Sequence, residues 1–164
     1  MLFRSPGPFN FSRLCNAGAA ATTADFLCFL NNDVAAGDPG WLAGLVGLAA
    51  RADVGAVGPL LRYPDGRLQH LGIRVEHPMP QLLGDGASEE DLRDCPARHV
   101  VREVAAVTGA CLVTRREVFA RVGGFDEGLA VAYNDVDYCM RVREAGFRVL
   151  WTPFVEMEIG RAHV

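Results

Sequence analysis

The chain has 164 residues, half of them apolar, which suits one domain of ordinary size with a single core. Its 16 basic and 20 acidic residues leave a formal charge of −4, so we expect no broad attraction to nucleic acid or anionic lipid. The longest apolar-rich stretch, residues 41–50, contains glycines and is shorter than the ~20 residues of a membrane span. The first ten residues lack a secretory signal, which favours a cytoplasmic protein without a transmembrane segment.

Helix and strand signals alternate in the first half of the chain. Asn10 or Ser12 can cap an alanine-rich helix, and an apolar strand follows over residues 25–30. The pair Asp38-Pro39 predicts the start of a second helix. We then expect a strand, a turn, a returning strand and a loop without periodicity, at residues 54–61, 63–67, 68–75 and 78–98.

The second half predicts two further strands and two helices. Residues 104–113 form the best remaining candidate for a buried strand. Thr114 and Glu117 have the spacing of a capping box, which predicts a short helix. A longer helix begins at residues 134–137 and ends at Gly146, and a strand over residues 147–151 follows. This order predicts an α/β layered domain with a hairpin and a loop inserted at one edge.

The apolar strand ends on three short polar residues, in the sequence FLCFLNNDV at residues 26–34. Ligands of open α/β sheets lie beyond the carboxyl ends of strands, and Asn31, Asn32 and Asp33 would lie at such an end. Their amide and carboxylate oxygens suit a hard divalent cation that also binds substrate phosphates. The alternative is an Asx turn that only leads the chain onward.

An acid-rich passage also leads into the last helix. Asp126 follows two glycines, and Asn134 and Asp135 begin the helix. Such a passage can form the rim of a pocket, although an acidic residue in a first helical turn also has a purely structural explanation in the helix dipole. Gly109 weakens the strand predicted around it unless a ligand or another backbone approaches closely.

The cysteines and histidines do not show metal-ligand spacing. The five cysteines include no CxxC pair, and three of them lie in apolar runs, which favours reduced core thiols. The histidines are interpreted as surface or turn residues, namely His70, His77, His99 and His163.

Several motifs in order resemble those of one enzyme family. They are PFNFSRLCNAGA, FLNNDV, GWLAGLVGLA, VGAVGPLLRYPDGRLQHLGI, VTGACLVTRREVFARVGGFDE and YNDVDYCMRVREAGFRVLWTPFVE. Together they resemble family 2 glycosyltransferases of the GT-A fold, and are especially similar to bacterial enzymes of O-antigen and rhamnan-type polysaccharide assembly. The resemblance implies a Rossmann-related mixed sheet flanked by helices, without the first strands of the nucleotide-binding half. It divides the chain into a partial GT-A domain at residues 1–158 and a tail at 159–164 that does not resemble the family.

The resemblance also implies roles for residues already singled out. Asn31, Asn32 and Asp33 occupy the DxD position, where Asp33 would bind Mg²⁺ or Mn²⁺ on the donor diphosphate. Asp135 stands at the second position of the (E/D)D motif, the catalytic base of inverting enzymes. Gly109 would lie on the donor side, and the acceptor side would include Asn134 and Asp126. His163 is not expected to replace the histidine ligand that the family places after its last strand.

These roles imply an inverting, metal-dependent transferase of the hexosyltransferase type. It would move a sugar from a nucleotide-diphosphate donor to a polysaccharide or lipid-linked acceptor in cell-surface glycan synthesis. The expected location is the cytoplasm, with peripheral association at the inner face of the plasma membrane left open, and no nucleic acid is expected as a partner. The alternative is a noncatalytic GT-A-like module that binds a sugar or a partner, or an inactive fragment.

Overall fold

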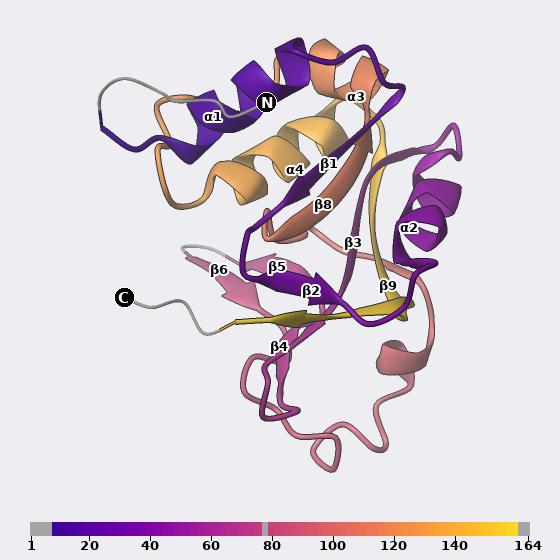
Figure 1. Cartoon of the computed structure of the whole chain (residues 1–164). Coiled ribbons are helices and arrows are strands. Elements are labelled where there is room, and N and C mark those ends of the chain that lie inside the picture. The colour runs from indigo at the N-terminus through magenta and orange to yellow at the C-terminus, as the bar shows by residue number, and fades with distance from the viewer. Residues whose placement is uncertain (1–7, 77–78, 161–164) are drawn as a thin grey trace.

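The computed structural model describes residues 8–76 and 79–160 (Figure 1). Its strands are β1 (Phe26–Leu30), β2 (Val34–Ala36), β3 (Val54–Arg62), β4 (Leu68–His70), β5 (Ile73–Glu76), β6 (Met79–Leu82), β7 (Arg102–Glu103), β8 (Cys111–Arg115) and β9 (Arg148–Ile159). Its helices are α1 (Phe11–Ala20), α2 (Trp41–Ala49), α3 (Arg116–Arg121), α4 (Asn134–Glu144) and the 3₁₀ helix η1 (Pro96–His99).

A mixed sheet forms the centre of the described residues. Its strands follow the order β1-β8-β3-β9-β2, with β4 paired to β3 and β7 paired to β9. The pair β3–β9 is parallel, whereas β8 runs antiparallel to both β1 and β3. Strands β5 and β6 form a separate antiparallel hairpin. The sheet and its flanking helices confirm the predicted α/β class.

Helices cover both faces of the sheet, and the apolar residues of β3 alternate between two cores. Ala56 and Leu60 belong to the core shared with α1, α3 and α4, while Val57 and Leu61 belong to the core shared with α2. Figure 1 shows α2 on the other side of the sheet from these three helices. A strand buried on both faces needs a nearly continuous apolar run, which explains the sequence of β3.

Local signals position α1 and α4 as the sequence indicates. The Asn10 side chain accepts a hydrogen bond of 2.9 Å from the Arg13 amide and caps α1. Gly146 follows α4 with φ of +90°, the left-handed conformation predicted for the end of this helix. Acidic residues in the first turn of α4 and basic residues in its last turn complement the helix dipole.

The strand predicted over residues 104–113 is wrong in extent. Only its end belongs to β8, although Val104, Ala106 and Val107 are buried. The amide of Val104 bonds to β9 at Val149, and Ala106 forms an isolated bridge with Ile73. The segment satisfies its backbone groups on different partners, so burial does not produce a regular strand here.

The predicted capping box at Thr114 is also wrong. Thr114 is still part of β8, and its hydroxyl donates to the Gly55 carbonyl at 2.7 Å and lies 2.8 Å from the Tyr138 hydroxyl. Helix α3 begins one residue later than this motif would place it, without a side-chain cap. Because β8 runs directly into α3, the hydroxyl is directed into the core instead of toward the helix start.

Other elements differ in length from the predictions. Strand β9 continues to Ile159 because its second half pairs with β2, a strand that the sequence did not indicate. Strand β6 lies at the start of the segment predicted as a loop, because it pairs with β5.

Two assignments of single side chains are wrong. His70 is buried in β4 rather than at the surface, because β4 packs into the core. Cys28 is exposed although its strand is apolar, because β1 is a terminal strand of the sheet, whereas Cys111 and Cys139 are buried as expected. The cysteines of the chain are free thiols. His77 and His163 lie outside the described residues.

Candidate active site

A cavity of about 370 Å³ lies beyond the end of β1. The chain leaves β1 through a 2.9 Å hydrogen bond from the Asn31 amide to the Ala110 carbonyl, so the polar residues after the strand stay beside β8. The predicted site residues in the lining are Asn31, Asn32, Gly109, Asn134 and Asp135. Folding therefore brings together two motifs that are about 100 residues apart in the sequence.

Two backbone amides hold the Asp135 carboxylate. Its Oδ2 accepts a hydrogen bond of 2.7 Å from Gly109, and its Oδ1 accepts one of 2.8 Å from Val136. A Cβ at residue 109 would lie 3.4 Å from the Asp135 Cβ, which is an ordinary van der Waals separation, so space alone does not require glycine at this position. Gly109 lies in the turn before β8 rather than inside a strand, and its contact with Asp135 is made by its backbone amide, which most other residues would also provide. Each carboxylate oxygen retains lone pairs that can accept a further hydrogen bond.

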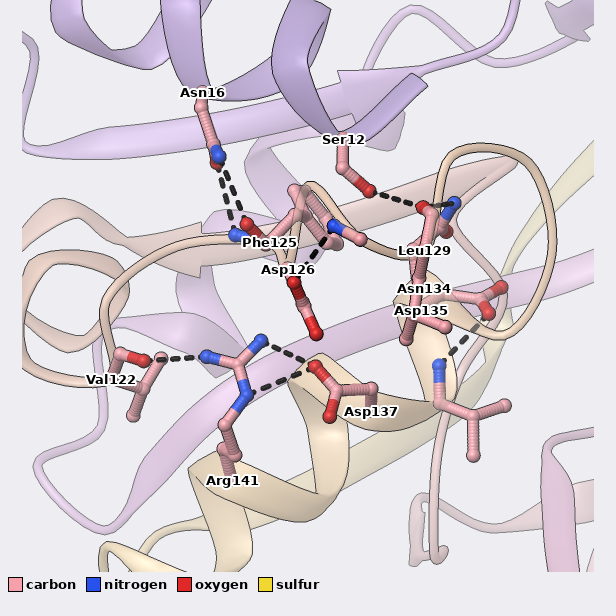
Figure 2. Close-up of polar contacts among 12 residues, drawn as sticks. Ser12, Asn16, Val122, Phe125, Asp126, Leu129, Asn134, Asp135, Asp137 and Arg141 are labelled. Carbon is pink, nitrogen blue, oxygen red and sulfur yellow. Dashed lines mark hydrogen bonds and ion pairs between the residues drawn. The ribbon is translucent and has the colours of Figure 1, made fainter. Parts of the chain in front are cut away.

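Helix α1 anchors the loop that leads to α4 (Figure 2). Asn16 exchanges two hydrogen bonds of 2.9 Å with the backbone of Phe125. Ser12 donates a bond of 2.7 Å to the Leu129 carbonyl, which also accepts a 3.4 Å bond from Asn134. The sequence did not indicate these roles of Ser12 and Asn16. The sequence feature that could have indicated them is the presence of two short polar side chains in an alanine-rich helix.

Helix α4 begins at Asn134 without a side-chain cap. The N-cap position belongs to Tyr133, which has φ of 63° and makes no side-chain capping bond. Asn134 is buried and directs its amide group back to Leu129 instead. The helix start is thus fixed by the loop before it and by the bonds of Asp135.

Two predicted site residues do not line this cavity. Asp33 lies where β2 begins, and its carbonyl accepts a 2.8 Å bond from the Gly160 amide at the end of β9. Within residues 8–76 and 79–160, no hydrogen bond or ion pair engages its exposed carboxylate. Asp126 accepts a 2.8 Å bond from Gly128 and closes a turn in the loop before α4.

The residues present fit a divalent cation only in part. Among the described residues no group of three or more His, Cys, Asp or Glu side chains could hold a metal ion. Magnesium commonly binds through one or two carboxylates and completes its coordination with water and substrate phosphates. The uncommitted carboxylate of Asp33, two residues from Asn31, meets this smaller requirement.

The match to a known family covers nearly the whole chain. Residues 3–159 match the family described as "Glycosyltransferase like family 2". The chain therefore belongs to this family of glycosyltransferases, as the sequence motifs predicted.

Similar proteins include bacterial sequences that are much longer than this chain. A Sinorhizobium fredii protein, y4gI, is 40% identical over 95% of this chain and 17% of its own length. The O-antigen biosynthesis protein RfbC of Myxococcus xanthus is 39% identical over 88% of this chain and 12% of its own. An N-acetylglucosaminyl-diphospho-decaprenol L-rhamnosyltransferase of Mycobacterium tuberculosis is 32% identical over 85% of this chain and 48% of its own. The chain thus spans less than half of each of these relatives.

Two solved structures share the fold. GalNAc-T7, solved with UDP, GalNAc and Mn²⁺, superposes with a TM-score of 0.71 and 16% identity over 96% of this chain and 32% of its own. A mannosyltransferase from Pyrobaculum calidifontis, solved with GDP-Man and Mn²⁺, superposes with a TM-score of 0.60 and 18% identity over 94% of this chain and 36% of its own. The chain has the GT-A fold of these enzymes. In the part of the chain that the structure describes, no helix is long and apolar enough to cross a membrane.

Proposed function

We propose that this chain carries the catalytic centre of an inverting glycosyltransferase that moves a sugar from a nucleotide-diphosphate donor to a hydroxyl of a glycan or lipid-linked acceptor. The observation that supports this function is the carboxylate of Asp135 in one cavity with Asn31 and Asn32 from the end of β1. The polar strand end would serve a binding module as well as an enzyme, whereas a carboxylate at the cavity, held in one orientation by two backbone amides, is what a catalytic base requires.

In this proposal Asp135 accepts the proton of the acceptor hydroxyl. The acceptor oxygen bonds to the anomeric carbon from the face opposite the diphosphate, while the bond between that carbon and the diphosphate breaks. The hydrogen bonds from Gly109 and Val136 keep the carboxylate in one orientation and leave lone pairs for the hydroxyl. A carboxylate is a weak base, but the hydroxyl becomes acidic as its oxygen attacks, so a concerted transfer suffices.

Asn31, Asn32 and Gly109 would contact the donor, and Asn134 would lie on the acceptor side of Asp135. Asp33 would hold Mg²⁺ or Mn²⁺, which supplies Lewis-acid stabilisation of the negative charge on the leaving diphosphate. The two structural neighbours were solved with Mn²⁺ and a nucleotide or nucleotide sugar, which supports this assignment. We place Asp126 at the edge of the acceptor side, in the loop that carries α4.

The relatives support a role in bacterial cell-surface glycan synthesis. One is named for O-antigen biosynthesis, and another for transfer of rhamnose to a decaprenol-linked sugar. A cytoplasmic site of action, with peripheral contact at the inner face of the plasma membrane, would give access to such acceptors.

The second candidate function is a GT-A-like module that binds a sugar or partner without turnover. The position of Asp33 outside the lining of the Asp135 cavity favours this candidate. The two candidates make different predictions for one substitution.

Asp135→Asn is expected to lower turnover by ~10²–10⁴ while donor affinity stays within about threefold. The measurement is nucleoside diphosphate release, as the sugar passes to water or to an added pyranoside acceptor, from a panel of UDP-, GDP- and dTDP-sugars with Mn²⁺, together with donor Kd by calorimetry. Asparagine keeps the size of the side chain but replaces one acceptor oxygen with a donor. A loss of stability is therefore also expected, and thermal melting of the variant must accompany the assay.

Asp137→Asn is the matched control for this experiment. Asp137 lies in the same helical turn, pairs with Arg141 at 2.6 Å and does not line the cavity, so turnover should remain normal. Equal turnover in both variants would remove Asp135 from catalysis. Donor binding without turnover in the unaltered chain would support the binding module, and absence of binding by every donor would contradict the proposed transferase.

A further inference from the structure

A second cavity of about 190 Å³ shares Asp135 with the cavity already described. Thr108 also belongs to the lining of both. Asp135 therefore lines two separate cavities. This arrangement is what a base needs if it is to contact a second substrate beside the donor.

The rest of the second lining is apolar. Ile73, Pro80 and Leu82 come from the hairpin of β5 and β6, while Tyr133 and Val136 come from the start of α4. Ligand pockets in proteins typically combine such an apolar lining with a few polar groups that orient the ligand.

Tyr133 is an aromatic residue held at the surface in an unfavourable backbone conformation. Among the described residues it is the only non-glycine residue with positive φ, at 63°, and it is 48% exposed. Leu82 across the cavity is 41% exposed. Strained residues cluster at binding and catalytic sites, where the surrounding structure maintains them. Tyr133 is thus a partly exposed aromatic residue in the lining of this cavity.

The charge of the lining selects the kind of ligand. Among residues 8–76 and 79–160, Asp135 is the only member of this lining whose side chain is charged at neutral pH, and no basic residue belongs to the lining. A phosphate would be repelled by the carboxylate and would find no cationic partner. A neutral ring with hydroxyl donors on its rim and C–H groups on one face satisfies both the carboxylate and the apolar surface.

We propose that this second cavity, the Tyr133 subsite (Ile73, Pro80, Leu82, Tyr133 and Val136), binds a neutral pyranose ring of the acceptor. The ring lies against Tyr133 and Leu82 and directs one hydroxyl to Asp135. This inference rests on the proposed function, because the hydroxyl at Asp135 is the one that would attack the donor. The specificity for the acceptor sugar then depends on the shape of the cavity between the β5–β6 hairpin and the start of α4.

Saturation-transfer NMR with neutral methyl pyranosides tests the subsite directly. The probes are methyl glycosides of rhamnose, galactose, mannose and N-acetylglucosamine, with glucose 1-phosphate as the anionic comparison. At least one neutral probe is expected to receive saturation at its ring C–H protons, and glucose 1-phosphate should receive at least fivefold less. Tyr133→Gly should reduce the signal at least fivefold, whereas Tyr133→Phe should retain it.

Glycine removes the ring but accepts positive φ, so this variant should fold. Phe154→Ala is the matched control, since Phe154 is an exposed aromatic residue of β9 outside the subsite. This variant should bind the probe normally. Equal signals in Tyr133→Gly and Phe154→Ala, or absence of signal from every neutral probe, would overturn the subsite. Loss in Tyr133→Phe as well would also overturn it, because that variant keeps the ring.

The experiments distinguish a failure of the proposed function from a failure of the Tyr133 subsite. If pyranoside binding depends on Tyr133 while Asp135→Asn keeps full nucleotide release, the subsite stands and the catalytic role of Asp135 falls. If nucleotide release depends on Asp135 while no pyranoside binds, the subsite falls and the catalytic role stands.

Discussion

Asp33 and Asp135, the two carboxylates central to the proposed function, have different surroundings. Asp135 accepts two backbone hydrogen bonds inside a cavity, and these bonds fix its orientation. The Asp33 carboxylate is exposed and engages no hydrogen bond or ion pair in the described ranges 8–76 and 79–160. An orienting environment suits a base, whereas an uncommitted carboxylate suits a metal ligand.

Asp33→Ala should abolish Mn²⁺-dependent donor binding, because neither Asn31 nor Asn32 can replace the carboxylate. Stability should change by less than about 0.5 kcal/mol, since the side chain is exposed and makes no hydrogen bond or ion pair with the described residues. Donor Kd with and without Mn²⁺ provides the measurement. Asn31→Ala should have a smaller effect, and Asp25→Ala, at another exposed carboxylate, should have none. An unchanged dependence on Mn²⁺ in Asp33→Ala would remove Asp33 from the site.

His70 is a buried titratable residue behind the candidate site. Its Nε2 accepts a 3.4 Å hydrogen bond from the amide of Thr108, a residue of both cavities. Burial, with a smaller effect of Arg102, lowers the pKa of His70 from 6.5 to about 3. The folded chain therefore keeps a neutral imidazole where the unfolded chain takes up a proton.

The free energy of unfolding should fall as the pH drops from 6.5 toward 3. At pH 5 the contribution of His70 is a loss of about 2 kcal/mol relative to pH 7, because the unfolded state alone binds the proton. His70→Gln should flatten this dependence in urea titrations at several pH values, while the exposed His99→Gln should not. Identical pH profiles for the two variants would show that His70 does not titrate in this way.

At the scale of elements, α1 fixes the loop that carries α4. Asn10 at its N-cap bonds to the backbone of Glu127, and Ser12 and Asn16 within the helix bond to the backbone of Leu129 and Phe125. The ring of Phe125 then packs edge-on against Phe11 and Phe29, with centroids 6.0 and 4.9 Å away. The orientation of Asp135 thus depends on a helix more than 100 residues earlier in the chain.

Asn16→Ala should lower the free energy of unfolding by about 1–3 kcal/mol, because it leaves the amide and carbonyl of Phe125 without their partner. It should also reduce turnover by loosening the loop before α4. Urea unfolding and nucleotide release are the two measurements. Thr22→Ala, which removes an exposed bond to Ala24 beyond the end of α1, should cost about 0.5 kcal/mol or less. A stability of Asn16→Ala equal to that control would contradict the anchoring role.

At the scale of the whole molecule, β1 is a terminal strand of the sheet and pairs with β8 on one side. A groove of about 380 Å³, lined by residues of α1 and β1, lies beside it. Leu30 on this strand is 43% exposed. An apolar strand edge that pairs with nothing promotes association between chains.

The chain is therefore expected to bind hydrophobic dyes and to associate at micromolar concentration. Leu30→Lys should raise the monomer fraction in size-exclusion chromatography, because a charge at the strand edge opposes pairing. Leu42→Lys is the matched control, since Leu42 is 41% exposed but lies on α2. A monomeric, cooperatively melting chain that binds no dye would contradict this expectation, as would equal effects of the two lysines.

The sequence by itself predicted the elements whose signals are local. The cap at Asn10, the apolar run of β1 and the left-handed Gly146 each depend on residues within a few positions, and the structure has them as predicted. The motifs around Asn31 and Asp135 also identified the family, because their order along the chain is itself the signal. The predicted roles of the site residues remain predictions.

Only the tertiary structure decided which side chains meet. The burial of His70, the hydroxyl partners of Thr114 and the links from Ser12 and Asn16 join segments that are far apart in the sequence. The left-handed Tyr133 could not be predicted either, because the conformation opposes the intrinsic preference of the residue and depends on the loop around it. Local patterns encode periodicity and caps, whereas the two cavities at Asp135 form only when packing brings α4 against β8 and the β5–β6 hairpin.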